Sequence, residues 1–232
     1  TLSSIKGTYS VVLMAVVDSQ YRFTLIDVGA PGRAADSAVF RDSLIGKGLQ
    51  TGTLGLPGLA ALPNSNTVLP HVFVGDEAFQ LHTQFMRPYP GRQLDPGHRI
   101  FNYRLSRARR CSENAFGILA NRWRVLLRPI NLSPDNAVHV VLACCVLHNY
   151  LIGRKESRDE GDTCDSFGNI TEGSWHTVED VIEAAMPRLQ KTQARNHAKD
   201  AAEARDRFRD FFMSQSGQVP WQWAKCHIPV PT

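Results

Sequence analysis

The sequence lacks a CxxC pair of cysteines. Its 232 residues include five cysteines, an odd number, so neither a disulfide framework nor a structural zinc site is expected. A reducing intracellular compartment is the simplest setting for such a chain. Cys144 and His148 are four residues apart in an expected helix, a spacing that places two metal ligands on one face. No second pair accompanies them, and we interpret both as core residues.

Motifs of several common enzyme classes are also missing. There is no GxxxxGK[ST] phosphate loop, no GxSxG nucleophile turn and no HExxH helix, which argues against the NTPases, hydrolases and zinc peptidases that carry them. No zinc finger or similar DNA-reading module is found. There is no uncharged apolar run of membrane-spanning length and no signal-peptide pattern, so neither a membrane span nor secretion is expected. With 43% apolar and 21% charged residues, the composition is that of a globular protein.

Acidic residues are almost absent from residues 99–128, where arginine is abundant. That stretch carries eight arginines and a single carboxylate, Glu113. An ion pair of Glu113 with Arg109 or Arg110 would contribute only about 0.2–0.5 kcal/mol in an isolated helix. It would also leave the other arginines without partners. This excess of arginine predicts contact with an anionic polymer such as DNA, held mainly through its phosphates.

Hydrophobic patterning predicts strands in the first half of the chain and helices in the second. Residues 8–18 and 21–28 are apolar and β-branched, with a polar turn between them, which indicates a hairpin. Further expected elements are a short helix capped by Asp36 or Ser37, a loop over 46–67, a strand over 68–74, a helix over 99–127, a buried apolar helix after Ser133-Pro134, a flexible acidic segment over 158–173 and a helical region over 178–212. This order predicts an α/β fold in which helices cover a mixed sheet.

Two carboxylates occupy positions that suit metal ligands in such a fold. Asp76 ends the apolar run VFVGD, and functional groups gather at the carboxyl ends of strands in α/β sheets. An aspartate at a strand end is also an ordinary turn residue, and both interpretations stay open. Glu113 lies at the flank of its helix, in a column of small or polar residues that includes Gly117 and Ala120. That column would let the helix approach a sheet edge, where two carboxylates suit magnesium or manganese and phosphodiester chemistry.

An ordered series of motifs resembles one known family. The stretches are KGTYSVVLMAVVD, DVGAPGRAADSAVF, HVFVGDEAF, MRPYPG, RIFNYRLSRARRCSENAFGILANRWRV, VLACCVLHNYL and, near the C-terminus, RDRFRDFFMSQSGQVPWQW. They are similar to the Harbinger-type transposases and the nucleases derived from them, within the DDE endonuclease superfamily. The resemblance covers almost the whole chain.

The resemblance implies an RNase H-like mixed sheet flanked by helices, with three carboxylates that hold divalent metal. Asp76 would be the second carboxylate, at the end of the fourth strand, and Glu113 the third. The family's first aspartate lies upstream of KGTYS, where this chain has only TLSSI, so we expect the first strand to be absent. Asp36 matches a recurrent aspartate of the family and would orient the site, but helix capping explains it at least as well.

The same resemblance implies a DNA endonuclease that hydrolyses or transfers phosphodiester bonds, with magnesium or manganese as its cofactor. Contacts to the DNA backbone are expected from Arg107, Arg109, Arg110, Arg122 and Arg124. In the family, a separate Myb/SANT-like DNA-binding protein often supplies sequence recognition, so such a partner is expected here. The tail from Trp221 to Trp223 is either its docking site or a segment folded back on the core. The nucleus, and with it the cytoplasm, is the expected location.

We expect three consecutive regions: an endonuclease core over 1–155 that is incomplete at its N-terminus, a flexible acidic insertion over 156–174, and a C-terminal helical region with its tail over 175–232. The absent first carboxylate supports a second hypothesis beside the nuclease. In that hypothesis the chain is a catalytically inactive, domesticated transposase fragment that binds DNA or a protein.

Overall fold

The computed structural model describes residues 10–32, 36–154, 161–186 and 198–229. The chain divides into two compact units, each assembled from separate stretches of sequence. Unit 1 comprises Thr1–Lys47, Arg110–Thr163 and Ile170–Gln190, and unit 2 comprises Gly48–Arg109, Cys164–Asn169 and Lys191–Thr232. The two units interleave along the chain, whereas the sequence predicted three consecutive regions.

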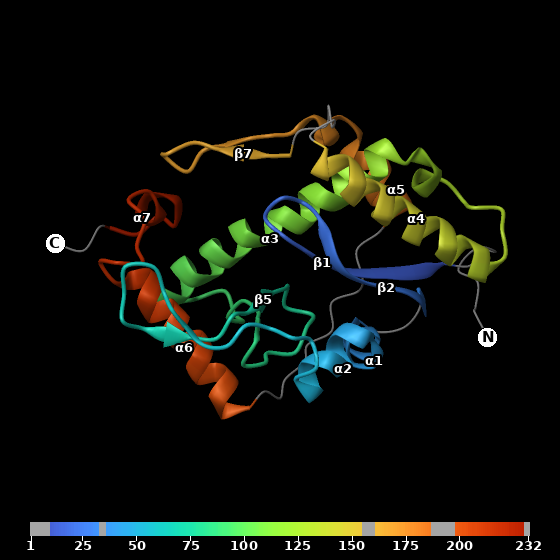
Figure 1. The fold of residues 1–232 in the computed structure, drawn as a ribbon. Helices are drawn as coiled ribbons and strands as arrows, with labels where there is room; N and C mark the ends of the chain where they lie inside the picture. Colours follow the sequence, from blue (N-terminus) through green and yellow to red (C-terminus); the bar gives the residue numbers. More distant parts are fainter. Residues whose placement is uncertain (1–9, 33–35, 155–160, 187–197, 230–232) are drawn as a thin grey trace. The chain divides into compact units, whose positions relative to one another are not determined.

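Unit 1 contains the β-hairpin that the sequence predicted (Figure 1). β1 (Val11–Val17) pairs antiparallel with β2 (Phe23–Pro31). The carboxylate of Asp18 closes the turn by accepting the backbone N–H groups of Gln20 and Arg22, at 2.8 and 3.0 Å. A short acidic side chain at the start of the turn therefore fixes the reversal of the chain.

Two short helices follow the hairpin. α1 (Asp36–Asp42) matches the predicted helix, and α2 (Leu44–Thr51) occupies residues where the predicted loop was to begin. The hydroxyl of Ser43 joins them, because it donates to the Phe40 carbonyl at 2.6 Å and accepts the N–H of Gly46 at 2.9 Å. The glycines of α2 concealed its helical pattern.

α4 (Pro134–Gly153) begins where the sequence predicted but is not buried all round. Ser133 caps it, with Oγ accepting a backbone N–H three residues on at 3.4 Å. One face joins the unit 1 core, whereas another exposes Val146, Leu147 and Tyr150. The prediction of a fully buried helix was wrong because the hairpin and its neighbours cover one face only. Among the described helices, α4 alone is long and apolar enough to cross a membrane, a criterion that core helices also meet.

The buried face of α4 is tied to the hairpin by hydrogen bonds. The amide side chain of Asn149 accepts the N–H and donates to the C=O of Phe23, each at 2.8 Å. His148 is fully buried and donates from Nε2 to the Tyr21 carbonyl at 2.8 Å. Cys144 lies in the same core. The interpretation of Cys144 and His148 as core residues is therefore confirmed.

α3 (Pro96–Arg122) contributes residues to both units. The predicted helix over 99–127 is confirmed up to Arg122, after which the chain forms the 3-10 helix η1 (Arg124–Leu127). In unit 1, the buried Ala115 and Leu119 of α3 pack with Phe23 of the hairpin.

Unit 2 contains two strand pairs in place of the single strand predicted over 68–74. β4 (Val68–Leu69) pairs antiparallel with β3 (Ala60–Ala61), and β5 (Phe73–Val74) pairs parallel with β6 (Phe85–Met86). Pro70 separates β4 from β5, because proline has no N–H to donate to a neighbouring strand.

The unit 2 core lies between the first part of α3 and α6 (Lys199–Met213). Phe101 of α3 packs with Phe208 of α6 and with the segment around β4 and β6. Beyond α6, the short α7 (Gln222–Lys225) brings Trp223 against Ile100, where it is 4% exposed. Trp223 therefore belongs to a tail folded back on the core.

The described residues form a mixed α/β architecture, as predicted. Their strands pair only two by two, in four separate sheets. Within the segment predicted to be a flexible insertion, β7 (Thr163–Cys164) pairs with β8 (Ile170–Thr171), ahead of η2 (Ser174–Val178) and α5 (Glu179–Ala185). An RNase H-like sheet that lacks its first strand stays a prediction.

Candidate active site

Asp76 follows β5 and Gly75, at the carboxyl end of a strand in a parallel pair. The N–H of Gly75 donates to the Met86 carbonyl at 2.9 Å, which extends the pairing up to the aspartate. A Cβ on Gly75 would lie 2.5 Å from the buried Phe85 ring, so a larger residue would displace that ring. Asp76 is half-buried, and its Oδ1 accepts the N–H of Ala78 at 2.9 Å. Asp76 is thus a turn residue at a strand end. This position agrees with both interpretations from the sequence, a metal ligand and an ordinary turn residue.

Glu113 lies on the part of α3 that belongs to unit 1 and is half-buried. Its neighbour Asn114 is 2% exposed, and the Asn114 Oδ1 accepts the backbone N–H of Asp162 at 3.0 Å and the indole N–H of Trp175 at 2.6 Å. One turn further on, a Cβ on Gly117 would lie 2.2 Å from the Trp175 ring. The small residue beside Glu113 therefore makes room for an indole ring. The prediction that this column lets the helix approach a sheet edge was wrong.

A charge network centred on Asp162, whose backbone N–H is bound by Asn114, was not predicted from the sequence. The nearly buried Asp162 carboxylate forms an ion pair with Arg110, accepts the N–H of Gly173 at 3.0 Å and lies 2.9 Å from the His176 Nε2. The His176 Nδ1 lies 2.6 Å from a carboxylate oxygen of Glu179. Both ring nitrogens face acceptors, so the imidazole donates twice and carries a positive charge.

The pKa shifts in this network agree with its geometry. Burial alone would lower the pKa of His176, but hydrogen bonds with Glu179 and Asp162 raise it above the ordinary value. Burial likewise acts to raise the pKa of Asp162, whereas hydrogen bonds from Gly173, Arg110 and His176 lower it. These hydrogen bonds therefore favour the charged forms of both side chains and tie the segment around η2 to α3 through Asp162.

The arginines of residues 99–128 are largely used inside the protein. Arg107 donates to the Gly168 carbonyl at 2.9 Å and lies 4.9 Å from the centre of the Trp221 ring. Arg104 donates to the side chain of Gln222 at 3.0 Å. Arg99 donates to the backbone carbonyl of Cys226, and Arg110 donates to the carboxylate of Asp162, each within its own unit. The inference that the arginines lack partners was therefore wrong, because the partners come from distant parts of the sequence.

The remaining candidate residues differ in how far the structure describes them. Asp36 is the first residue of α1, and its side chain lies outside the described residues. Asp76 belongs to unit 2 and Glu113 to unit 1. Arg124, on η1, is exposed.

The described residues offer carboxylate oxygens as donors for a metal ion. Among the described residues, no group of three or more histidine, cysteine, aspartate or glutamate side chains is placed to hold a metal ion. The two half-buried carboxylates of Asp76 and Glu113 do have the donor chemistry that magnesium and manganese prefer. In the described part of the chain, the Asp76 side chain accepts the N–H of Ala78 through Oδ1. Asp76 and Glu113 therefore match magnesium and manganese in the type of donor atom that they offer.

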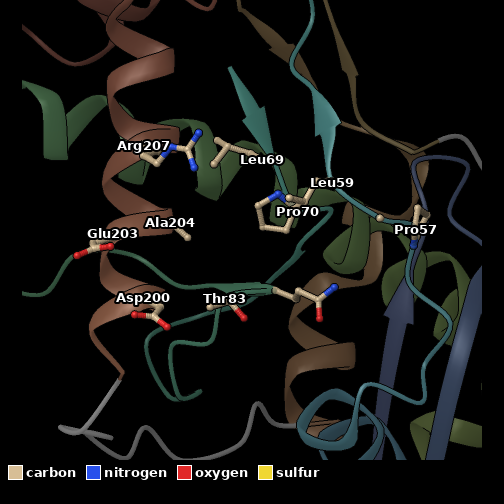
Figure 2. Close-up of a pocket in the computed structure, with 11 residues that line it drawn as sticks. Pro57, Leu59, Leu69, Pro70, Thr83, Asp200, Glu203, Ala204 and Arg207 are labelled. Atoms are coloured by element: carbon tan, nitrogen blue, oxygen red, sulfur yellow. The ribbon is translucent and has the colours of Figure 1, made fainter. Parts of the chain in front are cut away.

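A cavity of about 440 Å³ lies within unit 2 (Figure 2). Ala204 and Arg207 of α6 line one side of it, with Leu69 and Pro70 from the end of β4 facing them. The guanidinium of Arg207 donates to a β4 carbonyl at 2.8 Å. Asp76 does not line this cavity, and neither does any arginine predicted to bind DNA. Among the described residues, the lining of the cavity therefore includes none of the carboxylates that the sequence selected.

Comparison with known proteins identifies relatives of the chain. Residues 1–149, which include Asp76 and Glu113, match a family described as DDE superfamily endonuclease. Protein ALP1-like of Arabidopsis thaliana is 30% identical over 153 residues, which are 64% of this chain and 36% of the relative. The protein named "Putative nuclease HARBI1" in Rattus norvegicus is 28% identical over 147 residues, 62% of this chain and 38% of the relative. The matched part of the chain thus spans little more than a third of each relative. No solved structure matches significantly.

Proposed function

Because this chain belongs to the family of DDE superfamily endonucleases, we propose that it cleaves phosphodiester bonds of DNA with the help of a divalent cation, magnesium or manganese. The family match over residues 1–149 carries the proposal, since that span holds both Asp76 and Glu113. We infer a closer relation to the Harbinger-type transposases from the ordered motifs of the sequence, and with it an RNase H-like core.

In this proposal Asp76 and Glu113 hold the cation. Such a cation, when bound, stabilises negative charge on the phosphate and on the attacking and leaving oxygens. The protein's part is to keep each carboxylate half-buried and oriented, because ion attraction is stronger where water is partly excluded. For Asp76, the pairing of Gly75 with Met86 and the packing of Phe85 support this role. Asp36, at the start of α1, would orient the site from outside the metal ligands.

DNA would be held through its phosphates by arginines. Of the five candidates, which are Arg107, Arg109, Arg110, Arg122 and Arg124, Arg124 is exposed, whereas Arg107 and Arg110 have acceptors inside the protein. We therefore expect Arg124→Ala to weaken DNA binding and to reduce the slope of log affinity against log salt by about 1. Arg207→Ala, which alters an exposed arginine outside the family match, is the control and should leave that slope unchanged. An unchanged slope in Arg124→Ala would remove this residue from the DNA contact.

A Myb/SANT-like DNA-binding protein is the proposed partner for sequence recognition, and the nucleus, with the cytoplasm, is the proposed location. Fractionation of cells that express the tagged chain tests the location. Co-purification with and without nuclease treatment tests whether such a partner binds directly or through DNA.

The activity itself is tested by nicking of supercoiled plasmid. The assay is run on this chain and on a longer version that carries whatever coding sequence lies upstream of Thr1. Nicking in manganese or magnesium that stops on chelation, in either version, is the expected result. A persistent failure of both versions to nick, under conditions where DNA binding is measurable, would refute the proposal.

The alternative is a catalytically inactive binding module descended from a transposase. One observation favours it: no group of three metal-binding side chains occurs among the described residues. This alternative predicts salt-sensitive DNA binding without cleavage in either version, and equal DNA affinity for wild type and Glu113→Gln.

A further inference from the structure

Arg87, in the MRPYPG stretch, is a buried arginine that donates hydrogen bonds to backbone carbonyls. It follows β6 and is 7% exposed. Arginine is rarely buried to this degree unless its guanidinium is well satisfied, because removal of the charge from water is costly. Burial lowers the pKa of Arg87, and the nearby Glu77 acts in the opposite direction. A guanidinium buried to this degree needs hydrogen-bond acceptors inside the protein.

Its acceptors are two backbone carbonyls of the turn that carries Asp76. The Arg87 Nη1 donates to the carbonyl of Glu77 at 3.3 Å and to that of Phe79 at 3.1 Å. The same turn is bounded on one side by the hydrogen bond from Gly75 to Met86, the residue next to Arg87. One side chain thus spans a turn that lies some ten residues earlier in the chain.

The bond to Glu77 has a direct consequence for Asp76. The carbonyl of Glu77 and the N–H of Ala78 belong to one planar peptide group. Arg87 holds the oxygen end of this group, and its N–H end donates to the Asp76 Oδ1 at 2.9 Å. Hydrogen bonds in such a chain polarise and orient one another, so the guanidinium acts on the carboxylate through a single rigid peptide.

We propose that Arg87 is a positioning residue for Asp76, which fixes the rotation of the Asp76 carboxylate through the peptide group between Glu77 and Ala78. With Oδ1 bound to that peptide, Oδ2 is left to a ligand. This inference deepens the proposed function and rests on it only for the identity of that ligand as a divalent cation.

The test compares two buried arginines. Arg87→Met removes the donors while keeping an unbranched side chain, and Arg205→Met does the same at an arginine that is 6% exposed and belongs to the same unit. Arg205 donates to the Pro88 carbonyl at 3.4 Å and lies 3.9 Å from the centre of the Tyr89 ring, so it does not bond to the Asp76 turn. Arg87→Lys, which retains a charged donor, serves as the conservative variant.

The first measurement needs no metal: hydrogen exchange of the Ala78 amide, followed by NMR. We expect Arg87→Met to accelerate this exchange at least about tenfold, Arg205→Met to leave it within about twofold, and Arg87→Lys to restore part of the protection. Equal acceleration in both methionine variants, or none in Arg87→Met, would overturn the proposal. If Arg87→Met does not fold, Arg87→Lys is compared with Arg205→Lys by the same criterion.

The second measurement is the manganese concentration that gives half-maximal nicking. Loss of a residue that orients a metal ligand should raise it about 10- to 100-fold without changing the KM for DNA. An unchanged manganese requirement in an active Arg87→Met, despite fast Ala78 exchange, would overturn the claim that the orientation serves a ligand. If no version of the chain nicks DNA, the proposed function fails, while the exchange result still decides whether Arg87 positions Asp76.

Discussion

The packing of Gly117 against Trp175 makes a quantitative prediction, because two effects of Gly117→Ala oppose each other. Gly117 lies inside α3, where replacement of glycine by alanine favours the helix by about 1 kcal/mol. The added Cβ would, however, lie 2.2 Å from one atom of the Trp175 ring and 2.3 Å from another. Trp175 is 6% exposed, so the ring has little room to move.

The clash is expected to prevail. Overpacking of a filled core costs about 1–3 kcal/mol. Displacement of the ring also stretches the 2.6 Å hydrogen bond from the Trp175 indole to Asn114, whose loss costs about 1 kcal/mol. After the gain in helix propensity is subtracted, Gly117→Ala should lower the free energy of unfolding by about 1–3 kcal/mol.

Urea unfolding followed by circular dichroism measures this change. Gly153→Ala is the matched control, since Gly153 also lies in a helix but a Cβ there meets nothing within 4 Å. It should be neutral or stabilise the protein by up to about 1 kcal/mol. In a Trp175→Leu background the penalty of Gly117→Ala should largely disappear. A Gly117→Ala protein as stable as wild type would refute the account of this contact.

Further predictions concern the charge network and the hairpin. For His176, whose pKa is raised on folding, the stabilisation is fully present below its ordinary pKa of 6.5 and is lost as pH rises through the raised value. The pKa of Asp162 is lowered, so its contribution is present above its ordinary 3.8 and is lost as pH falls through the lowered value. The difference in unfolding free energy between wild type and His176→Gln should therefore be largest between these two ordinary values, and a pH-independent difference would contradict the network. Asn149→Ala removes the two hydrogen bonds, each of 2.8 Å, to the N–H and C=O of Phe23. Thermal unfolding should show that unit 1 is destabilised by about 2–4 kcal/mol. A loss below about 0.5 kcal/mol would show that water replaces both bonds.

Elements set by local patterns could be predicted from the sequence. The hairpin was predicted because alternation of apolar residues and the Asp18 turn are properties of neighbouring residues. The start of α4 was predicted for the same reason, from Ser133 and Pro134. The strand expected over 68–74 was wrong although the sequence did contain the signal, a proline at position 70.

Features that depend on distant parts of the chain could not be predicted. Arg107 was interpreted as a cation without a partner because its acceptor, the carbonyl of Gly168, lies 61 residues later in the sequence. Gly117 was interpreted as space for a sheet, since nothing local indicates that Trp175 fills it. The position of Asp76 at a strand end was predicted from VFVGD alone, whereas the role of Arg87 becomes visible only once the β5 and β6 strands pair.

The central claim is that the Asp76 carboxylate takes part in DNA cleavage. The most direct measurement is the manganese-dependent nicking rate of Asp76→Asn against Glu77→Gln, in whichever version of the chain is active. Glu77 is the exposed neighbour of Asp76, so both variants lose one carboxylate from the same turn. A metal centre contributes several kcal/mol to such a reaction, so Asp76→Asn should be slower by about 100-fold or more, while Glu77→Gln stays within about threefold of wild type. Equal rates for the two variants would contradict the account.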